Sequence, residues 1–264
     1  MKCEVVICIE TVAGDAFASF YPRMASAEWT RVRQQQLMLQ DMYDEYADTY
    51  DEELCGKGGL GYRTPELLEA ALLARPGRLA ADVSEGVLSR TNALDVGCGT
   101  GLMGMLLRAR CEGQLLGCDL SARMLKVGAE SRPGLYDATE EADGVSYLRS
   151  RPAGQADLVV ACEVFPHMES LVDFFRAAEA ALCLGGVFAF SVEEGLPEEC
   201  ADHGWVERQE TGRVAHSAEY LRSLAAAAAS ELELSSLASV ELRHDGDEQV
   251  HGFAVLMTKV AVAA

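Results

Sequence analysis

The sequence predicts an α/β fold, in which a mostly parallel sheet is covered by helices on both faces. Apolar stretches near residues 92–96, 114–119, 144–148, 157–161 and 186–192 are the expected strands, with helical segments between most of them. Two more strand patterns, at 232–243 and 251–260, are joined by the polar turn 245–247. They predict that an antiparallel hairpin closes the sheet.

Two helices are expected before the first strand. In residues 28–50, apolar and aromatic side chains fall along one helical stripe. Thr64 and Pro65 suit the N-cap and first position of a second helix, which runs to about Ala74 and stops at 75–77. The alanine run at 225–229 is expected to be helical. Residues 1–27 hold a possible short strand followed by mixed sequence.

The segment 94–102 reads as a strand that ends in a glycine-rich turn and opens a helix. Its glycines are Gly97, Gly99 and Gly101, and Asp95 precedes them. A dinucleotide fingerprint would place its third glycine one position later, where a leucine stands. Glycines let the backbone approach a ligand, and N–H groups at a helix start suit a carboxylate. The turn therefore predicts a site for a nucleotide-like ligand, and its glycine spacing argues against the dinucleotide fingerprint.

Further candidate residues follow the later strands. Asp119 ends the second strand, where an acid can accept hydrogen bonds from both hydroxyls of a ribose, and Ser121 is a plausible N-cap for the next helix. Glu163 to His167 follow the fourth strand and should face the same crevice. Asp143 is placed to meet an adenine amino group, or is a turn residue before the third strand.

Composition limits the partners. The net charge is −20, with 42 acidic against 22 basic residues, which disfavours DNA or RNA as a substrate. Nine cysteines without paired metal spacing indicate a reducing, cytoplasmic setting and no metal site, and organelle targeting stays open. No apolar run approaches membrane-spanning length, and the acids among the first ten residues argue against a signal peptide.

The acid and three glycines of the turn resemble motif I of the class I S-adenosylmethionine-dependent methyltransferases. Segments 42–51, 60–68, 191–193 and 213–217, with Tyr220, look like the predicted TPR-methyltransferases, a group similar to the methyltransferase encoded in the Williams–Beuren syndrome region. The likeness covers about residues 40–260. Two features depart from it: no 34-residue helical period is present, and Val214 stands where a tyrosine is expected.

The resemblance implies a class I methyltransferase, Rossmann-like three-layer sandwich whose seven-stranded, mostly parallel sheet has an antiparallel C-terminal strand. It divides the chain into an N-terminal extension, 1–39, and a methyltransferase domain, 40–264, with a helical lid at 40–75. It also implies S-adenosyl-L-methionine as the cofactor. The residues expected to bind it are Asp95, Gly97, Cys98, Gly99, Gly101, Asp119, Leu120, Asp143, Glu163, Tyr50 and Tyr62.

The expected activity is in-line methyl transfer to a small-molecule or protein acceptor. A general base is needed only if the acceptor must lose a proton. His216, in a loop-like polar stretch, is the leading candidate, and His167 is the second. Tyr43, Tyr46, Tyr50 and Tyr62 could form an aromatic lid, or could simply pack. A non-catalytic cofactor-binding protein that works through a partner is the alternative, and a nicotinamide dehydrogenase is a more distant one.

Overall fold

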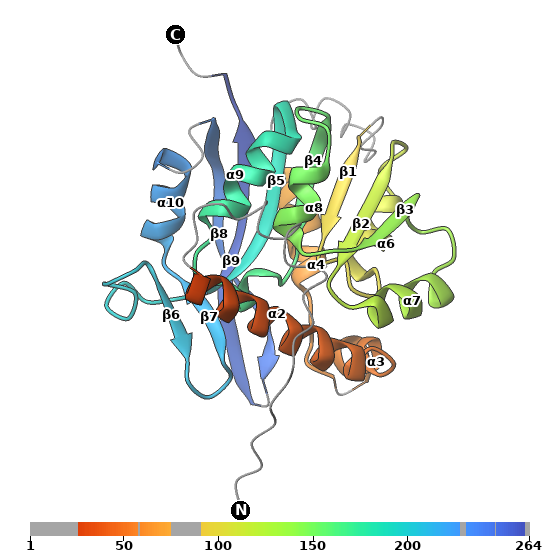
Figure 1. Ribbon diagram of the computed structural model, residues 1–264, viewed down its shortest axis with the longest axis horizontal. Helices are drawn as coiled ribbons and strands as arrows, with labels where there is room; N and C mark the ends of the chain where they lie inside the picture. Colours follow the sequence, from red (N-terminus) through yellow and green to blue (C-terminus); the bar gives the residue numbers. More distant parts are fainter. Residues whose placement is uncertain (1–25, 58, 75–90, 228–230, 246, 262–264) are drawn as a thin grey trace, which may run out of the picture.

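The computed structural model describes residues 26–57, 59–74, 91–227, 231–245 and 247–261. Their strands form one nine-stranded sheet in the order β3-β2-β1-β4-β5-β7-β6, with β9 also paired to β5 and β8 to β9 (Figure 1). The first five of these strands are parallel. They are β1 (Ala93–Val96), β2 (Leu115–Asp119), β3 (Ala138–Glu141), β4 (Ala156–Ala161) and β5 (Leu182–Glu194).

Two hairpins complete the sheet beside β5. Strands β8 (Leu232–Asp245) and β9 (Glu248–Lys259) pair with each other, and β9 runs antiparallel to β5. The shorter hairpin of β6 (Trp205–Arg208) and β7 (Arg213–His216) joins β5 only at its last residues. The α/β class and the antiparallel end are thus confirmed. The strand count exceeds the expected seven because the β6–β7 hairpin is an addition.

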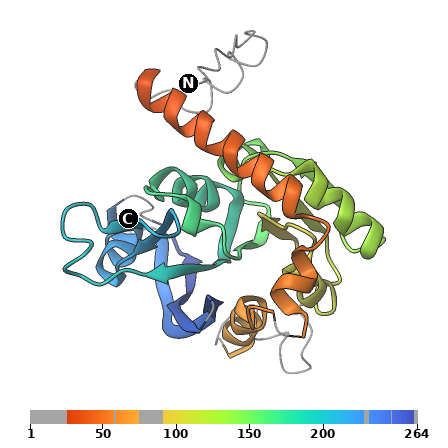
Figure 2. The same ribbon diagram turned by 90° about the horizontal axis from the view of Figure 1, so that it is seen from below.

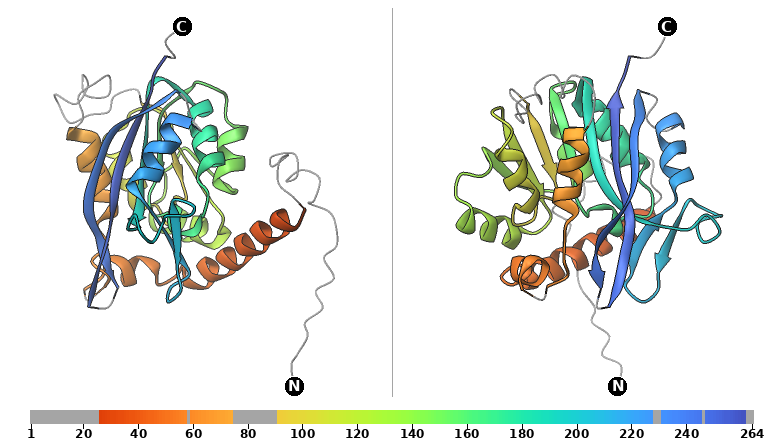
Figure 3. Two further views of the ribbon diagram at one scale, coloured as in Figure 1. Left: turned by 90° about the vertical axis from the view of Figure 1, so that its left-hand side faces the viewer. Right: turned by 180° about the vertical axis from the view of Figure 1, so that it is seen from behind.

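The central strands of the sheet are buried on both faces, as their near-continuous apolar sequences predict. Leu158 and Val160 of β4 pack with α4 (Thr64–Ala74) and α6 (Leu102–Arg108) on one face. The alternate residues, Val159 and Ala161, face the opposite cluster, which is covered by α8 (Gly144–Ser150), α9 (Val172–Ala181) and α10 (Ala218–Ala227). Figure 3 shows helices on both sides of the sheet.

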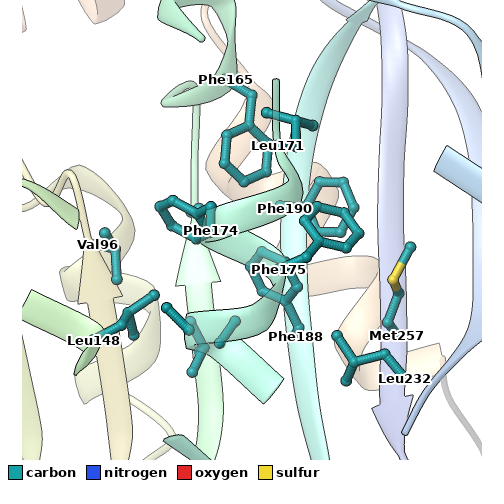
Figure 4. Close-up of a cluster of buried hydrophobic side chains, with 14 of the residues drawn as sticks. Val96, Leu148, Phe165, Leu171, Phe174, Phe175, Phe188, Phe190, Leu232 and Met257 are labelled. Atoms are coloured by element: carbon teal, nitrogen blue, oxygen red, sulfur yellow. The ribbon is translucent and has the colours of Figure 1, made fainter. Parts of the chain in front are cut away.

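A phenylalanine cluster anchors the loop that follows β4. Phe165 lies in the 3-10 turn η2 (Phe165–His167), and its ring meets Phe174 edge-to-face at 4.8 Å and Phe190 at 5.3 Å (Figure 4). Burying one such ring stabilises the fold by about 1.5–3 kcal/mol. The loop that carries Glu163 and His167 is therefore fixed to the core.

The expected single helix over 28–50 is wrong in one respect. Helix α2 (Ser26–Tyr46) ends before a three-residue turn, and α3 (Tyr50–Cys55) begins afterwards. Figure 2 shows α2 and α3 lying across one end of the sheet. Ala47 lies in the turn between the two helices and is buried, so the bend packs both helices against the domain.

The third strand is also misplaced in the sequence prediction. Residues 144–148 begin α8, and the strand is Ala138–Glu141, which is exposed throughout. Asp143 is the N-cap of α8, and its side chain accepts a hydrogen bond from the N–H of Ser146 at 3.0 Å. That cap starts a helix in a segment whose apolar residues look like a strand.

Several other expectations can be compared directly. The helix at 64–74, the strands near 92–96, 114–119 and 157–161 and the C-terminal hairpin are confirmed within a few residues. The stretch 213–217 is not a loop, because β7 occupies 213–216. The possible short strand within residues 1–27, the stop at 75–77 and the end of the alanine run fall in parts of the chain that are not among the described residues. The division at residue 39 stays a prediction, and α2 continues across it.

Candidate functional site

The glycine turn adopts the backbone that its sequence predicts. Gly97, Gly99 and Gly101 all have positive φ values of 70°, 52° and 101°. A Cβ on Gly97 would lie 2.4 Å from Cγ2 of Val164, whereas a Cβ on Gly99 would have no described atom within 4 Å. Gly97 therefore allows the close packing of the loop after β4, and Gly99 leaves open space at the surface of the turn.

Asp95 lies behind this turn and not in front of it. Its side chain is buried, and Oδ2 accepts a hydrogen bond from the Tyr136 hydroxyl at 2.7 Å. Burial raises its pKa to about 7. Its Oδ1 is buried and has no partner among the described residues. Asp95 can thus support the turn from behind, and its side chain does not lie on the side of the turn where a ligand would bind.

Asp119 reaches the front of the turn from the end of β2. Its Oδ2 accepts the N–H of Gly99 at 2.8 Å, and Oδ1 accepts the N–H of Ser121 at 2.9 Å. Burial is the main reason why its pKa is raised. Ser121 in turn caps α7 (Ala122–Ser131), since its Oγ accepts the N–H of Met124 at 2.9 Å. The expected N-cap is confirmed, and it fixes the acid beside the glycines.

A cavity of about 320 Å³ opens at this point, and we call it the glycine-loop cavity. Ligand sites in proteins commonly have volumes of about 300–1,000 Å³. The expected cofactor residues on its wall are Gly97, Gly99, Asp119, Leu120, Asp143, Glu163 and Tyr50. The cavity thus combines an open glycine turn with the expected acids Asp119, Asp143 and Glu163, an arrangement that suits a ligand with hydroxyl and amino donors.

Helices α2 and α3 form the outer wall of this cavity. Arg31 of α2 pairs with Glu169 at 2.6 Å, and both residues line the cavity. At the other end, the Asp51 carboxylate of α3 accepts bonds from Thr100 at 2.5 Å and from Arg132 at 2.6 Å. These polar contacts, together with the buried side chains of Ala47 and Leu54, attach the two helices to the domain.

Glu163 is held in an unusual position at the end of β4. Its φ is +59°, the only positive value of a non-glycine residue in the described part of the chain. Its Oε2 accepts from Arg213 at 3.0 Å and from Arg243 at 2.6 Å. Both arginines also donate to Oε1 of Glu193, Arg213 at 2.5 Å. These four residues, which we call the ion quartet, hold the strained backbone in place.

A second cavity, of about 470 Å³, lies on the other side of Glu163. It is called here the tyrosine cavity because Tyr43, Tyr46, Tyr50 and Tyr62 all line it, together with Arg213 and Arg243. Tyr43, Tyr50 and Glu163 line both cavities. The four tyrosines expected in a lid are thus brought together, and two of them stand between the two cavities.

The two candidate histidines differ in position. His167 lines the glycine-loop cavity, and its Nε2 is hydrogen-bonded to the Tyr43 hydroxyl at 2.8 Å. Burial lowers its pKa to about 4, with Arg213 adding to the effect, and burial raises that of Tyr43 to about 12. Both groups are therefore neutral at ordinary pH.

His216 does not fit the role of leading base. Its ring is fully buried in β7, stacks on Tyr220 and donates from Nε2 to the backbone oxygen of Glu169 at 3.1 Å. It lines neither of the two cavities formed by the described residues. The polar sequence around it indicated a loop, but strand pairing buries it. We therefore assign it a packing role.

Other expected residues support the site without lining the glycine-loop cavity. Asp95, Cys98 and Gly101 lie in or behind the turn, and Tyr62 lines the tyrosine cavity, with its hydroxyl 3.3 Å from Sγ of Cys162. Arg31 and Gln35 of α2 line the cavity but were not among the expected site residues. The predicted helix from residue 28 contains both residues, but its periodicity does not indicate which face meets a ligand. The pairing within the ion quartet had no signal in the sequence.

The comparisons with known proteins agree with this geometry. Residues 94–188 match the family model described as a methyltransferase domain. A curated relative, erythromycin 3''-O-methyltransferase of Saccharopolyspora erythraea, is 32% identical over 171 residues, which make up 61% of this chain and 54% of the relative. The chain thus spans about half the length of the curated relative that it matches.

Solved structures show the same fold at low sequence identity. Magnesium protoporphyrin IX methyltransferase from Synechocystis PCC 6803 aligns with a TM-score of 0.59 and 13% identity over 85% of this chain and 97% of that one. The cyclase SpnF aligns with a TM-score of 0.63 and 17% identity over 86% and 97%. The chain therefore has the class I methyltransferase fold. Among its described residues, no helix has the length and apolar character needed to cross a membrane.

Proposed function

We propose that this protein is an S-adenosylmethionine-dependent methyltransferase that acts on a small-molecule acceptor. The observation that carries the proposal is the glycine-loop cavity. Its wall contains both the open glycine turn and Asp119, the two features that the sequence predicts for the cofactor site. The methyltransferase domain match over 94–188 covers this turn and this acid. The relatives named for methyl transfer supply the reaction class, which the fold alone does not fix.

The residues of the cavity fit the cofactor. The space in front of Gly99 is open, and a Cβ there would project into it without meeting a described atom. The Asp119 carboxylate is suited to ribose hydroxyls, and Asp143, at the N-cap of α8, lies on the wall where an adenine amino group could be met. S-adenosylmethionine, when bound, supplies a methyl group on a sulfonium, and its transfer leaves the electron pair of the carbon–sulfur bond on sulfur.

The protein contributes to the reaction by positioning the reactants and by excluding water from the cavity. Helices α2 and α3 cover the cavity, and the paired side chains of Arg31 and Glu169 form part of its wall. Tyr43 and Tyr50 stand where the two cavities meet, so they can align an acceptor with the cofactor. Holding reactants in line can supply about 7–11 kcal/mol of the barrier reduction. His167 is neutral and can take a proton released by the acceptor, through Tyr43 or directly.

The curated relative acts, by its name, on an oxygen of erythromycin, and this supports a small molecule as the acceptor class for the chain. The similarity to the predicted TPR-methyltransferases and the Williams–Beuren region methyltransferase is kept as a narrower part of the proposal. It draws on segments 42–51 and 60–68, which contribute Met42, Tyr43, Tyr50 and Tyr62 to the cavity walls.

Binding and turnover are tested separately. Titration with S-adenosylmethionine measures the cofactor site, and a screen for S-adenosylhomocysteine release with small-molecule acceptors measures catalysis. Micromolar binding together with acceptor-dependent release supports the enzyme. Binding with no release across a broad acceptor set favours the non-catalytic, partner-dependent alternative. Absence of binding refutes both.

A further inference from the structure

We propose that the tyrosine cavity is the acceptor site and that it selects an uncharged, largely apolar small molecule. The inference rests on the proposed function, because it assigns the acceptor of that reaction. Its starting point is that the tyrosine cavity shares Tyr43, Tyr50 and Glu163 with the glycine-loop cavity. A molecule in the tyrosine cavity therefore lies next to whatever occupies the glycine-loop cavity.

The walls of the cavity suit a ring or another compact apolar body. Besides its four tyrosines, it is lined by Met42, Leu54 and Leu60. Tyr46 and Tyr50 already form an edge-to-face pair with ring centroids 5.3 Å apart, and Tyr43 meets Tyr50 at 6.3 Å. Aromatic rings in such arrangements add about 0.5–1.5 kcal/mol per pair to the energy of burial. A volume of about 470 Å³ holds a small molecule and not a folded protein domain.

The ion quartet determines the charge preference. Its two arginines and two glutamates balance, and each arginine contacts both carboxylates. An added carboxylate would meet arginines that are already paired with Glu163 and Glu193, and an added ammonium would meet a Glu163 carboxylate that is already paired with both arginines. Neither would find an unmatched counter-charge in the quartet, and burial of an unmatched charge is costly. The remaining charged residue of the wall, Glu45, is exposed, so water solvates it.

Glu163 gives the cavity one polar contact point. Its Oε1 is bonded to the Ser191 hydroxyl at 3.1 Å, and Oε2 takes the two arginine donors. A carboxylate has about four acceptor positions, so it can accept one further hydrogen bond from a neutral hydroxyl or amine. Because Glu163 also lines the glycine-loop cavity, that bond would hold the nucleophilic atom of the acceptor at the junction.

Three probes with one bicyclic frame test the charge preference on the full-length protein. They are 2-naphthol, 2-naphthoate and 2-naphthylmethylammonium, which are neutral, anionic and cationic at neutral pH. Calorimetric affinities are measured with and without S-adenosylhomocysteine. We expect 2-naphthol to bind at least about tenfold more tightly than either ion. Equal or tighter binding of an ion overturns the inference.

Two methionines of α2 test the location. Met42 lines the cavity and is 47% exposed, and Met38, one turn earlier, is 73% exposed and lines neither cavity. Met42→Trp should weaken 2-naphthol binding by about tenfold or more, and Met38→Trp should leave it unchanged. S-adenosylhomocysteine affinity should be the same in both variants. If the two variants bind 2-naphthol equally well, the probe binds elsewhere and the location is wrong.

Two variants unbalance the quartet in opposite directions. Glu193→Gln leaves one positive charge in excess and should shift the preference about tenfold toward 2-naphthoate, whereas Arg213→Gln should shift it toward 2-naphthylmethylammonium. Shifts in the same direction, or none in folded variants, overturn the charge argument. If either variant fails to fold, the wild-type probe series decides alone. If the wild-type protein does not bind S-adenosylhomocysteine, the proposed function is refuted. The probe affinities measured without S-adenosylhomocysteine still test the tyrosine cavity in that case.

Discussion

Gly97→Ala tests the packing of the glycine turn against the loop that follows β4. An alanine at φ +70° costs about 1–2 kcal/mol in the left-handed region. Its Cβ would also lie 2.4 Å from Cγ2 of Val164, a β-branched side chain that has little freedom to turn away. Overpacking of this kind costs about 1–3 kcal/mol. The free energy of unfolding should therefore fall by about 2–5 kcal/mol.

Gly99→Ala is the matched control. Its φ is +52° and no described atom lies within 4 Å of the added Cβ, so only the backbone cost of about 1–2 kcal/mol is expected. The new methyl group enters the glycine-loop cavity, so this variant should lose more cofactor affinity than its small stability change implies. Urea denaturation with unchanged m-values measures the stabilities, and calorimetry measures the affinities.

A double variant separates overlap from backbone strain. Adding Val164→Ala to Gly97→Ala removes the overlapping methyl group and should recover about 1–3 kcal/mol relative to the sum of the single changes. If Gly97→Ala is no more destabilising than Gly99→Ala, or if the double variant shows no coupling, the packing of the turn is not as described.

Three further predictions concern buried polar groups. Arg243→Met should lower the free energy of unfolding by about 3–5 kcal/mol, measured by urea denaturation, because it leaves two buried carboxylates underpaired. Burial raises the pKa of Asp95 from 3.8 to about 7, so between these pH values the folded state keeps a proton that the unfolded chain releases. The free energy of unfolding should therefore fall as the pH rises from 3.8 to about 7. Asp95→Asn should flatten this dependence, which urea denaturation at a series of pH values measures. His167→Ala should lower kcat by about 10²-fold or more for an acceptor that must lose a proton, whereas His216→Ala should mainly lower stability; the reverse pattern in steady-state kinetics and melting would restore His216 as the base.

The parallel sheet and the glycine turn could be predicted because their signals are local. Strands such as β4 are continuous apolar runs, and the spacing of Gly97, Gly99 and Gly101 fixes the turn directly. Asp119 was found for the same reason, since it ends an apolar strand. These features need only the period of the sequence and the rule that ligands bind at the carboxyl ends of parallel strands.

The third strand had no such signal. β3 reads Ala-Thr-Glu-Glu and is exposed, so its place at the sheet edge comes from pairing with β2 and not from hydrophobic pattern. The neighbouring apolar residues Val145 and Leu148 lie three apart and face the core from α8. That spacing fits a helix, and the Asp143 cap decides between the two. If the Asp143 cap is not considered, the apolar residues of 144–148 also fit a strand, which is what the sequence analysis predicted.

The ion quartet required tertiary information. Its members come from the end of β4, from β5, from β7 and from β8, and the sequence separations of the bonded pairs range from 20 to 80 residues. Glu193 and Arg213 fell within segments used for the family resemblance, but no local pattern indicates that they pair. The same holds for His216, whose burial follows from the pairing of β7 with β5 and β6.

Calorimetric titration with S-adenosylmethionine tests the central claim most directly. The wild-type protein should bind it with micromolar affinity and should not bind NAD under the same conditions. Asp119→Ala should weaken binding by at least about tenfold, the loss of roughly one charge-assisted hydrogen bond. Glu130→Ala removes an exposed acid of α7 that lines neither cavity and should change nothing. Wild-type binding of NAD alone, or unchanged affinity in Asp119→Ala, would contradict the assignment of this site.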